Sequence, residues 1–142
     1  MTETRDAIIS RWFDAPVALV WRAFTDPDQL ASWYGPDGVE VVRESVSVEA
    51  RPGGAWSLTM VMGDRTMPLS GTVAEVEEPH RLVVTDQMPD GTTVTMTVEL
   101  VEENGGTRLQ LRQGPFPAEG AAGASGAWEQ AMDKLATSLA GH

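Results

Sequence analysis

The residues of this chain that could do chemistry are few. None of its 142 residues is cysteine, which excludes disulfides, a thiol nucleophile, zinc fingers and iron–sulfur clusters. Of the two histidines, His142 is the last residue and His80 lies in a Glu-Pro-His-Arg stretch typical of a surface turn. A serine nucleophile needs a base and an orienting acid, and the sequence has no Gly-x-Ser-x-Gly motif. We therefore expect no hydrolase triad, no metal site and no cofactor.

Asp86 is the carboxylate whose position could give acid–base chemistry. It shares a strand face with Leu82, Val84 and Met88, so an inward face would bury its carboxyl. Burial without a partner raises a carboxyl pKa, which would make Asp86 a candidate catalytic acid or base. The alternative is a residue at a strand end in water, or one turned outward by a bulge.

Large apolar side chains that suit a cavity wall are abundant. The chain has five Trp and seven Met, and methionine adapts its shape to irregular neighbours. Gln113 and Thr107 share a predicted strand face with two leucines and are candidates for inward polar groups, which a pocket needs to orient a ligand. Plain core packing and the lining of a cavity both account for this set. The residues expected to line such a cavity are Trp33, Trp56, Leu58, Met60, Met62, Met88, Met96, Leu111, Gln113, Phe116, Trp128 and Met132.

The net charge of the chain limits the classes of molecule that it can bind. Lys and Arg number 10 against 21 Asp and Glu, giving a formal net charge of −11, and this acidic average repels nucleic acid and anionic membranes. Solubility is one reading of the charge, and an acidic face for a basic protein is the other. No apolar run is long enough to span a membrane, and the start lacks the apolar core of a signal peptide. We therefore expect a cytoplasmic protein.

The N-terminal elements follow from apolar spacing and helix-start residues. Residues 7–13 are apolar and predict a strand, whereas residues 1–6 are expected to fray. Pro16 favours a helix start, since proline is tolerated in a first turn. Asp26 can cap a second short helix with Pro27 at its first position, and that helix should end near Gly35.

From residue 39 to residue 113 the apolar period changes to two, which predicts strands. Val39–Val48 is the first of six, and Asn104-Gly105-Gly106 before the last is a strong hairpin signal. Short turns between strands favour an antiparallel meander. Residues 114–123 are predicted to form a loop. An apolar stripe then predicts a long C-terminal helix, with Ala124, Trp128, Met132, Leu135 and Leu139 on one face.

This order predicts an α+β fold in one domain over residues 1–142, with an ordered core of about residues 7–140. A helix is roughly 10 Å wide with its side chains. Six or seven strands at roughly 4.8 Å spacing make a much wider sheet. One helix cannot cover that sheet completely, so we expect an apolar gap between them.

Several segments resemble the START-like (SRPBCC) superfamily, in the branch named after the activator of the heat-shock protein 90 ATPase. The resemblance implies a helix-grip fold, a curved antiparallel sheet that holds the long C-terminal helix around an apolar cavity. The matching segments cover roughly residues 7–140 in family order. They are Phe13-Asp14-Ala15-Pro16, Val20-Trp21-Arg22-Ala23-Phe24-Thr25-Asp26-Pro27, Trp33, Arg51-Pro52-Gly53-Gly54-Ala55-Trp56, Gly71-Thr72-Val73, Pro79-His80-Arg81-Leu82-Val83, Gly106-Thr107-Arg108-Leu109 and the stretch from Trp128 to Leu139.

Three functions remain open at this point. The gap and the missing catalytic constellation favour a non-catalytic protein that binds a small hydrophobic or aromatic molecule. The superfamily also implies an enzyme of the polyketide cyclase or aromatase type, for which Asp86 is the residue to test. The branch name implies a co-chaperone-like regulator of a heat-shock protein 90 homologue. An edge strand or an exposed tryptophan could also support a homodimer.

Overall fold

The computed structural model describes residues 3–87 and 91–140. Along the chain the elements are β1 (Thr4–Phe13), α1 (Val17–Thr25), α2 (Pro27–Trp33), β2 (Glu40–Val41), the 3₁₀ helix η1 (Arg43–Ser45), β3 (Ser47–Val48), β4 (Ala55–Met62), β5 (Arg65–Glu77), β6 (Arg81–Gln87), β7 (Thr93–Glu103), β8 (Gly106–Pro117) and α3 (Ala118–Ala140).

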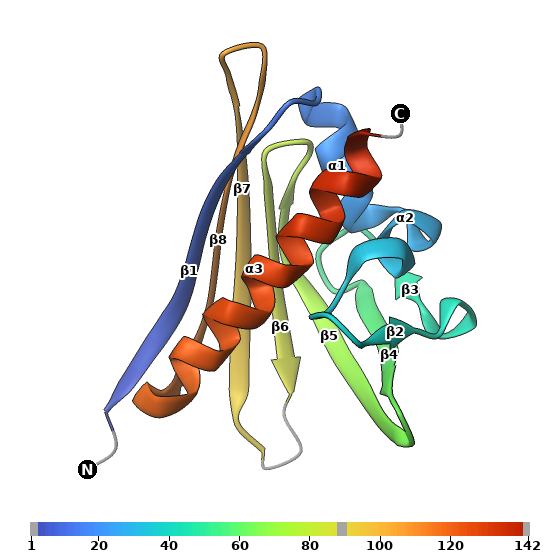
Figure 1. Ribbon diagram of the computed structural model, residues 1–142, viewed down its shortest axis with the longest axis vertical. Helices are drawn as coiled ribbons and strands as arrows, with labels where there is room; N and C mark the ends of the chain where they lie inside the picture. Colours follow the sequence, from blue (N-terminus) through green and yellow to red (C-terminus); the bar gives the residue numbers. More distant parts are fainter. Residues whose placement is uncertain (1–2, 88–90, 141–142) are drawn as a thin grey trace.

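The strands form an antiparallel sheet in the order β1-β8-β7-β6-β5-β4-β2, with β3 also paired to β4. The sheet curls, and α3 crosses its concave face diagonally (Figure 1). Helix α1 contacts β7 and β8, and α2 contacts β2 and α3. The predicted helix-grip fold is confirmed. Within the described residues, no helix combines the length and the apolar character needed to cross a membrane.

Local signals explain several element boundaries. Asp26 caps α2, because its carboxylate accepts hydrogen bonds from the backbone N–H groups of Asp28 and Gln29 at 2.9 and 3.3 Å. Asn104 and Gly105 join β7 to β8 with φ angles of 50° and 78°. Two successive positive φ values are the requirement of a type I′ hairpin turn. Both predicted features are confirmed.

The strand predicted over Val39–Val48 is wrong in its continuity. The structure breaks it into two-residue strands, β2 and β3, separated by η1. The hydroxyl of Ser45 donates to the carbonyl of Val42 at 2.5 Å and accepts from the backbone N–H of Thr59 at 2.8 Å. This side chain therefore replaces part of the ladder to β4, where residues 43–45 form the 3₁₀ helix.

Two predicted irregular regions are regular in the structure. Strand β1 begins at Thr4 rather than at residue 7, and Thr4 pairs with Pro117. The predicted loop over residues 114–123 is divided between the end of β8 and the first turns of α3. Pairing with β1 keeps the chain extended as far as Pro117. The stretch that follows is helical despite three glycines, which favoured the loop prediction, since its alanines are strong helix formers.

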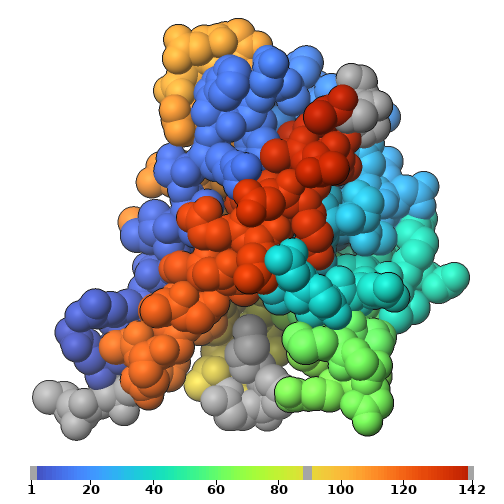
Figure 2. Space-filling view, viewed as in Figure 1, coloured from blue at the N-terminus to red at the C-terminus, as the bar shows by residue number. Residues whose placement is uncertain are grey.

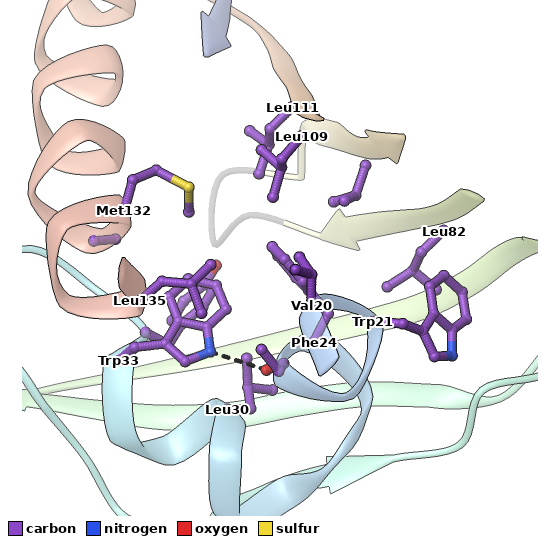
Figure 3. Close-up of a cluster of buried hydrophobic side chains, with 14 of the residues drawn as sticks. Val20, Trp21, Phe24, Leu30, Trp33, Leu82, Leu109, Leu111, Met132 and Leu135 are labelled. Carbon is purple, nitrogen blue, oxygen red and sulfur yellow. Dashed lines mark hydrogen bonds between the residues drawn. The ribbon is translucent and has the colours of Figure 1, made fainter. Parts of the chain in front are cut away.

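The core lies between the sheet, α1, α2 and the C-terminal half of α3. Figure 3 shows Met132 of α3 pointing towards Leu109 and Leu111 of β8. Trp33 is fully buried, and its indole N–H donates to the carbonyl of Ala23 at 2.9 Å, which fixes α2 against α1. The packed core therefore holds the last turns of α3 against the sheet.

Candidate functional site

The space beside the N-terminal half of α3 is not filled. A cavity of about 270 Å³, partly open to solvent, lies between α3, the inner face of the sheet and the segment that follows α2. Its walls come from residues far apart in the sequence. They are Tyr34, Gly35, Pro36, Met60, Leu69, Gln113, Ala124, Ala127, Trp128 and Ala131.

Tyr34 is the central aromatic residue of this wall. It comes directly after α2, where the backbone turns extended, and its side chain is only 7% exposed. Its ring centroid lies 5.4 Å from that of Trp56, 5.6 Å from Trp128 and 5.6 Å from Trp33. Contacts of this geometry fix ring positions, so α2, β4 and α3 together hold Tyr34 in place.

The segment after Tyr34 is fastened to α3. Gln130 accepts a hydrogen bond from the backbone N–H of Asp37 at 3.0 Å, and Lys134 donates to the carbonyl of Pro36 at 3.2 Å. Burial lowers the pKa of Lys134, and the nearby Asp37 partly opposes this. Figure 2 shows this segment, in cyan, against the middle of α3. One side of the cavity is thus a loop held by two side chains of the helix.

Gln113 supplies a polar group to the cavity wall. It pairs with the buried Met96 across β7 and β8, so both side chains lie on the inner face. The indole N–H of Trp128 donates to Gln113 Oε1 at 2.7 Å. Because an indole nitrogen can only donate, this contact orients the amide and leaves Nε2 free to donate elsewhere.

Asp86 lies on the inner face of β6 and is 1% exposed. It pairs with Gly71, and a Cβ at position 71 would collide with Asp86 Oδ1, so the glycine provides the room for the carboxyl group. Among the described residues, Oδ1 has no hydrogen-bond partner. Burial raises the pKa of Asp86 to about 6, and burial together with the negative charge of Asp86 raises the pKa of Tyr34.

The residues predicted to line a cavity are divided between several places. Met60, Gln113 and Trp128 lie on the cavity wall. Met62 is 40% exposed at the end of β4, Phe116 is half-buried near the end of β8, and Met88 falls outside the described residues. The other predicted lining residues belong to the buried core. They are Trp33, Trp56, Leu58, Met96, Leu111 and Met132.

The two other inward polar candidates differ in their surroundings. Thr107 is fully buried, but its hydroxyl donates to the carbonyl of Ala15 at 2.8 Å, where it ties β8 to the start of α1. Asp86 has no such partner among the described residues. Of the two, Asp86 Oδ1 is therefore the buried atom without any partner, whereas the Thr107 hydroxyl already has one.

Sequence reasoning missed Tyr34, Leu69 and the alanines of α3 as wall residues. One signal for the alanines was present: Ala124, Ala127 and Ala131 recur at helical spacing, so they form a stripe of small side chains. Tyr34 carried no comparable signal, because its position depends on where α2 ends relative to β4. The wall is therefore a product of tertiary structure more than of any local motif.

A comparison with family models decides the family. The model described as Activator of Hsp90 ATPase homolog 1-like protein matches residues 14–140. This chain belongs to that family. This family agrees with the START-like resemblance. The matched range includes every residue that lines the cavity. No curated protein matches the chain.

Solved structures of bacterial proteins share the fold of this family member. A Chromobacterium violaceum protein aligns with a TM-score of 0.86 at 25% identity, covering 94% of this chain and 96% of that one. A Nitrosomonas europaea protein aligns with a TM-score of 0.84 at 25% identity, covering 96% and 94%. CalU16 of Micromonospora echinospora aligns with a TM-score of 0.72 at 27% identity, covering 96% and 77%. The fold is thus shared across divergent sequences.

Proposed function

We propose that this protein binds a small hydrophobic or aromatic molecule in the cavity between α3 and the sheet. The observation that carries the proposal is the cavity of about 270 Å³ with walls of Trp, Tyr, Met, Leu and Ala. An engineered apolar cavity of about 150 Å³ accepts benzene, so the space here suits a molecule of one or two rings. Apolar walls with a few polar groups are the usual composition of a ligand site.

The cavity is a consequence of side-chain size on α3. Ala124, Ala127 and Ala131 face the sheet where larger residues would close the space. Nearer the C-terminus the same helix presents Met132 and Leu135, which are fully buried. The helix therefore packs tightly at one end and leaves room at the other.

Two measurements test the proposal. Native mass spectrometry of gently purified protein should show a copurified small molecule, or free protein that gains mass when one- and two-ring compounds are added. Binding should quench tryptophan fluorescence, because Trp128 lies on the wall. A panel of lipids and aromatic compounds that neither adds mass nor quenches fluorescence would contradict the proposal.

A matched pair of variants locates the site. Ala127→Phe places a ring in the cavity and should weaken binding at least about tenfold by occupying the space. Ala122→Phe makes the same change at an exposed position of α3 and should leave binding unchanged. Equal binding by both variants would place the ligand elsewhere.

A cyclase-like enzyme is the second candidate, and the buried Asp86 without a described partner is the observation that favours it. Its test is turnover of the copurified or added molecule, followed by mass spectrometry of the products. Turnover that persists unchanged in Asp86→Asn would remove Asp86 from any such mechanism.

A further inference from the structure

Two polar groups of the cavity wall, and a third in the sheet beside it, have unused hydrogen-bonding capacity. The hydroxyl of Tyr34 and Nε2 of Gln113 make no hydrogen bond to any described residue. Asp86 Oδ1 is buried and lacks a partner within the same part of the chain. Buried polar groups in proteins are nearly always hydrogen-bonded, so the enclosed Oδ1 of Asp86 needs an explanation, whereas Tyr34 and Gln113 face a cavity that is partly open to solvent.

The sheet register places Asp86 between two residues of the cavity wall. Its partner Gly71 lies two residues from Leu69 along β5, on the same face. In the other direction, Val84, two residues from Asp86, pairs with Met96, which pairs with Gln113. Asp86 thus belongs to the stretch of sheet floor that connects Leu69 to Gln113.

Tyr34 approaches the same floor from the opposite side. Its ring packs on Trp56, and Trp56 pairs with Gly71, the residue beside Asp86. The charge of Asp86 acts on the Tyr34 hydroxyl, since it contributes to the raised pKa of that group. Asp86 is not itself among the residues that line the cavity, but its carboxylate lies in the sheet floor between wall residues, close enough to act on the Tyr34 hydroxyl.

This combination matches one functional group. A hydroxyl has one hydrogen to donate and two lone pairs that accept, so it can satisfy an acceptor and a donor together. An ether or a ketone has nothing to donate to Asp86. A carboxylate ligand would meet the negative charge of Asp86 in a poorly solvated place, which is unfavourable.

We infer that the cavity selects an uncharged aromatic alcohol, a phenol or naphthol, whose hydroxyl donates to Asp86 Oδ1 and accepts from Gln113 Nε2 or the Tyr34 hydroxyl. The inference rests on the proposed function and names its ligand class. The pKa of about 6 leaves Asp86 mostly ionised at neutral pH, and hydrogen bonds to an ionised acceptor are the stronger kind.

Three probes of equal ring size test this class. The dissociation constants of 2-naphthol, 2-methoxynaphthalene and 2-naphthoate are measured at neutral pH by calorimetry and by ligand-observed NMR. The wild-type protein should bind 2-naphthol at least about tenfold more tightly than either of the others, as expected for a hydrogen bond to a charged group.

The Asp86→Asn variant tests the residue. It should lose most of the preference for 2-naphthol over 2-methoxynaphthalene, to within about threefold, while keeping affinity for the apolar ring system. Asp64→Asn makes the same chemical change at an exposed turn between β4 and β5 and should keep the wild-type preference. Thermal unfolding of both variants checks that they are folded.

The outcomes distinguish a failure of the inferred ligand class from a failure of the proposed function. Equal affinities for naphthol and its methyl ether in the wild type would overturn the inference and leave hydrophobic binding intact. A preference for 2-naphthoate, or a naphthol preference that survives in Asp86→Asn, would overturn it too. If none of the probes binds and the wider aromatic panel also fails, the proposed function itself fails.

Discussion

Replacing Asp86 by asparagine should make the protein's stability less dependent on pH. Burial raises the native pKa of Asp86 to about 6, above the ordinary 3.8 of the unfolded chain. The native state therefore holds this proton more tightly than the unfolded state, and the free energy of unfolding falls as pH rises through the interval between the two values. Asparagine removes the titrating group and with it this loss.

The magnitude follows from the difference between the two pKa values. That difference corresponds to about 3 kcal/mol in total, of which about 2 kcal/mol develops between pH 4.5 and pH 7.5. Relative to wild type, Asp86→Asn should gain about 2 kcal/mol of stability across this range. At pH 4.5 most native molecules carry a protonated Asp86, so the remaining difference there reflects mainly the exchange of a carboxyl for an amide.

Denaturant unfolding at several pH values between these limits measures the effect. Taking the difference between variant and wild type cancels the other carboxyl groups, which titrate in both proteins. Asp64→Asn, at an exposed position, is the control and should show a small difference at every pH. The reasoning is refuted if the advantage of Asp86→Asn is constant across the range, or if the variant loses stability relative to wild type as pH rises.

Other predictions concern the surroundings of the cavity. Gly71→Ala should destabilise the fold by at least about 2 kcal/mol. The new Cβ would collide with Asp86 Oδ1 and would lie 2.7 Å from the carbonyl oxygen of Trp56. A melting temperature equal to that of wild type would contradict this close packing. Gln113→Leu should lower the free energy of unfolding by about 1–3 kcal/mol, because it leaves the indole N–H of Trp128 without an acceptor. A blue shift in tryptophan fluorescence should accompany this loss of stability. An unchanged spectrum and unchanged stability would argue against the contact. If ligand binding is the function, saturating protein should leave the ATPase rate of a heat-shock protein 90 homologue unchanged, and clear stimulation would favour the co-chaperone alternative.

The features that could be predicted from sequence are those fixed by neighbours along the chain. Asp26 with Pro27 marks the start of α2, and Asn104 with Gly105 marks a hairpin, because each pair satisfies a local backbone requirement. Alternating apolar residues over β7 also place Met96 on the inner face. These local rules, with the spacing of the α3 stripe, predict the order of most elements, whereas the helix-grip arrangement was expected from the family resemblance.

The features that could not be predicted depend on residues distant in sequence. The break at Ser45 arises because its hydroxyl meets the backbone of Thr59, a partner on another strand. Strand parity offered Asp86 two environments, and only the sheet's position beneath Tyr34 and α3 selects the buried one. A cavity is defined by what neighbouring elements leave empty, and no single segment encodes that.

The division of α3 into two parts has a consequence for how relatives of this protein can diverge. Leu135 and Leu139 anchor the helix, whereas Ala124 and Ala127 offer only methyl groups to the open space. Larger or smaller residues at those two positions would change the volume of the cavity, while Leu135 and Leu139 would still hold the helix against the sheet. A few substitutions on a single helix can thereby change ligand specificity, while the residues that stabilise the fold remain the same.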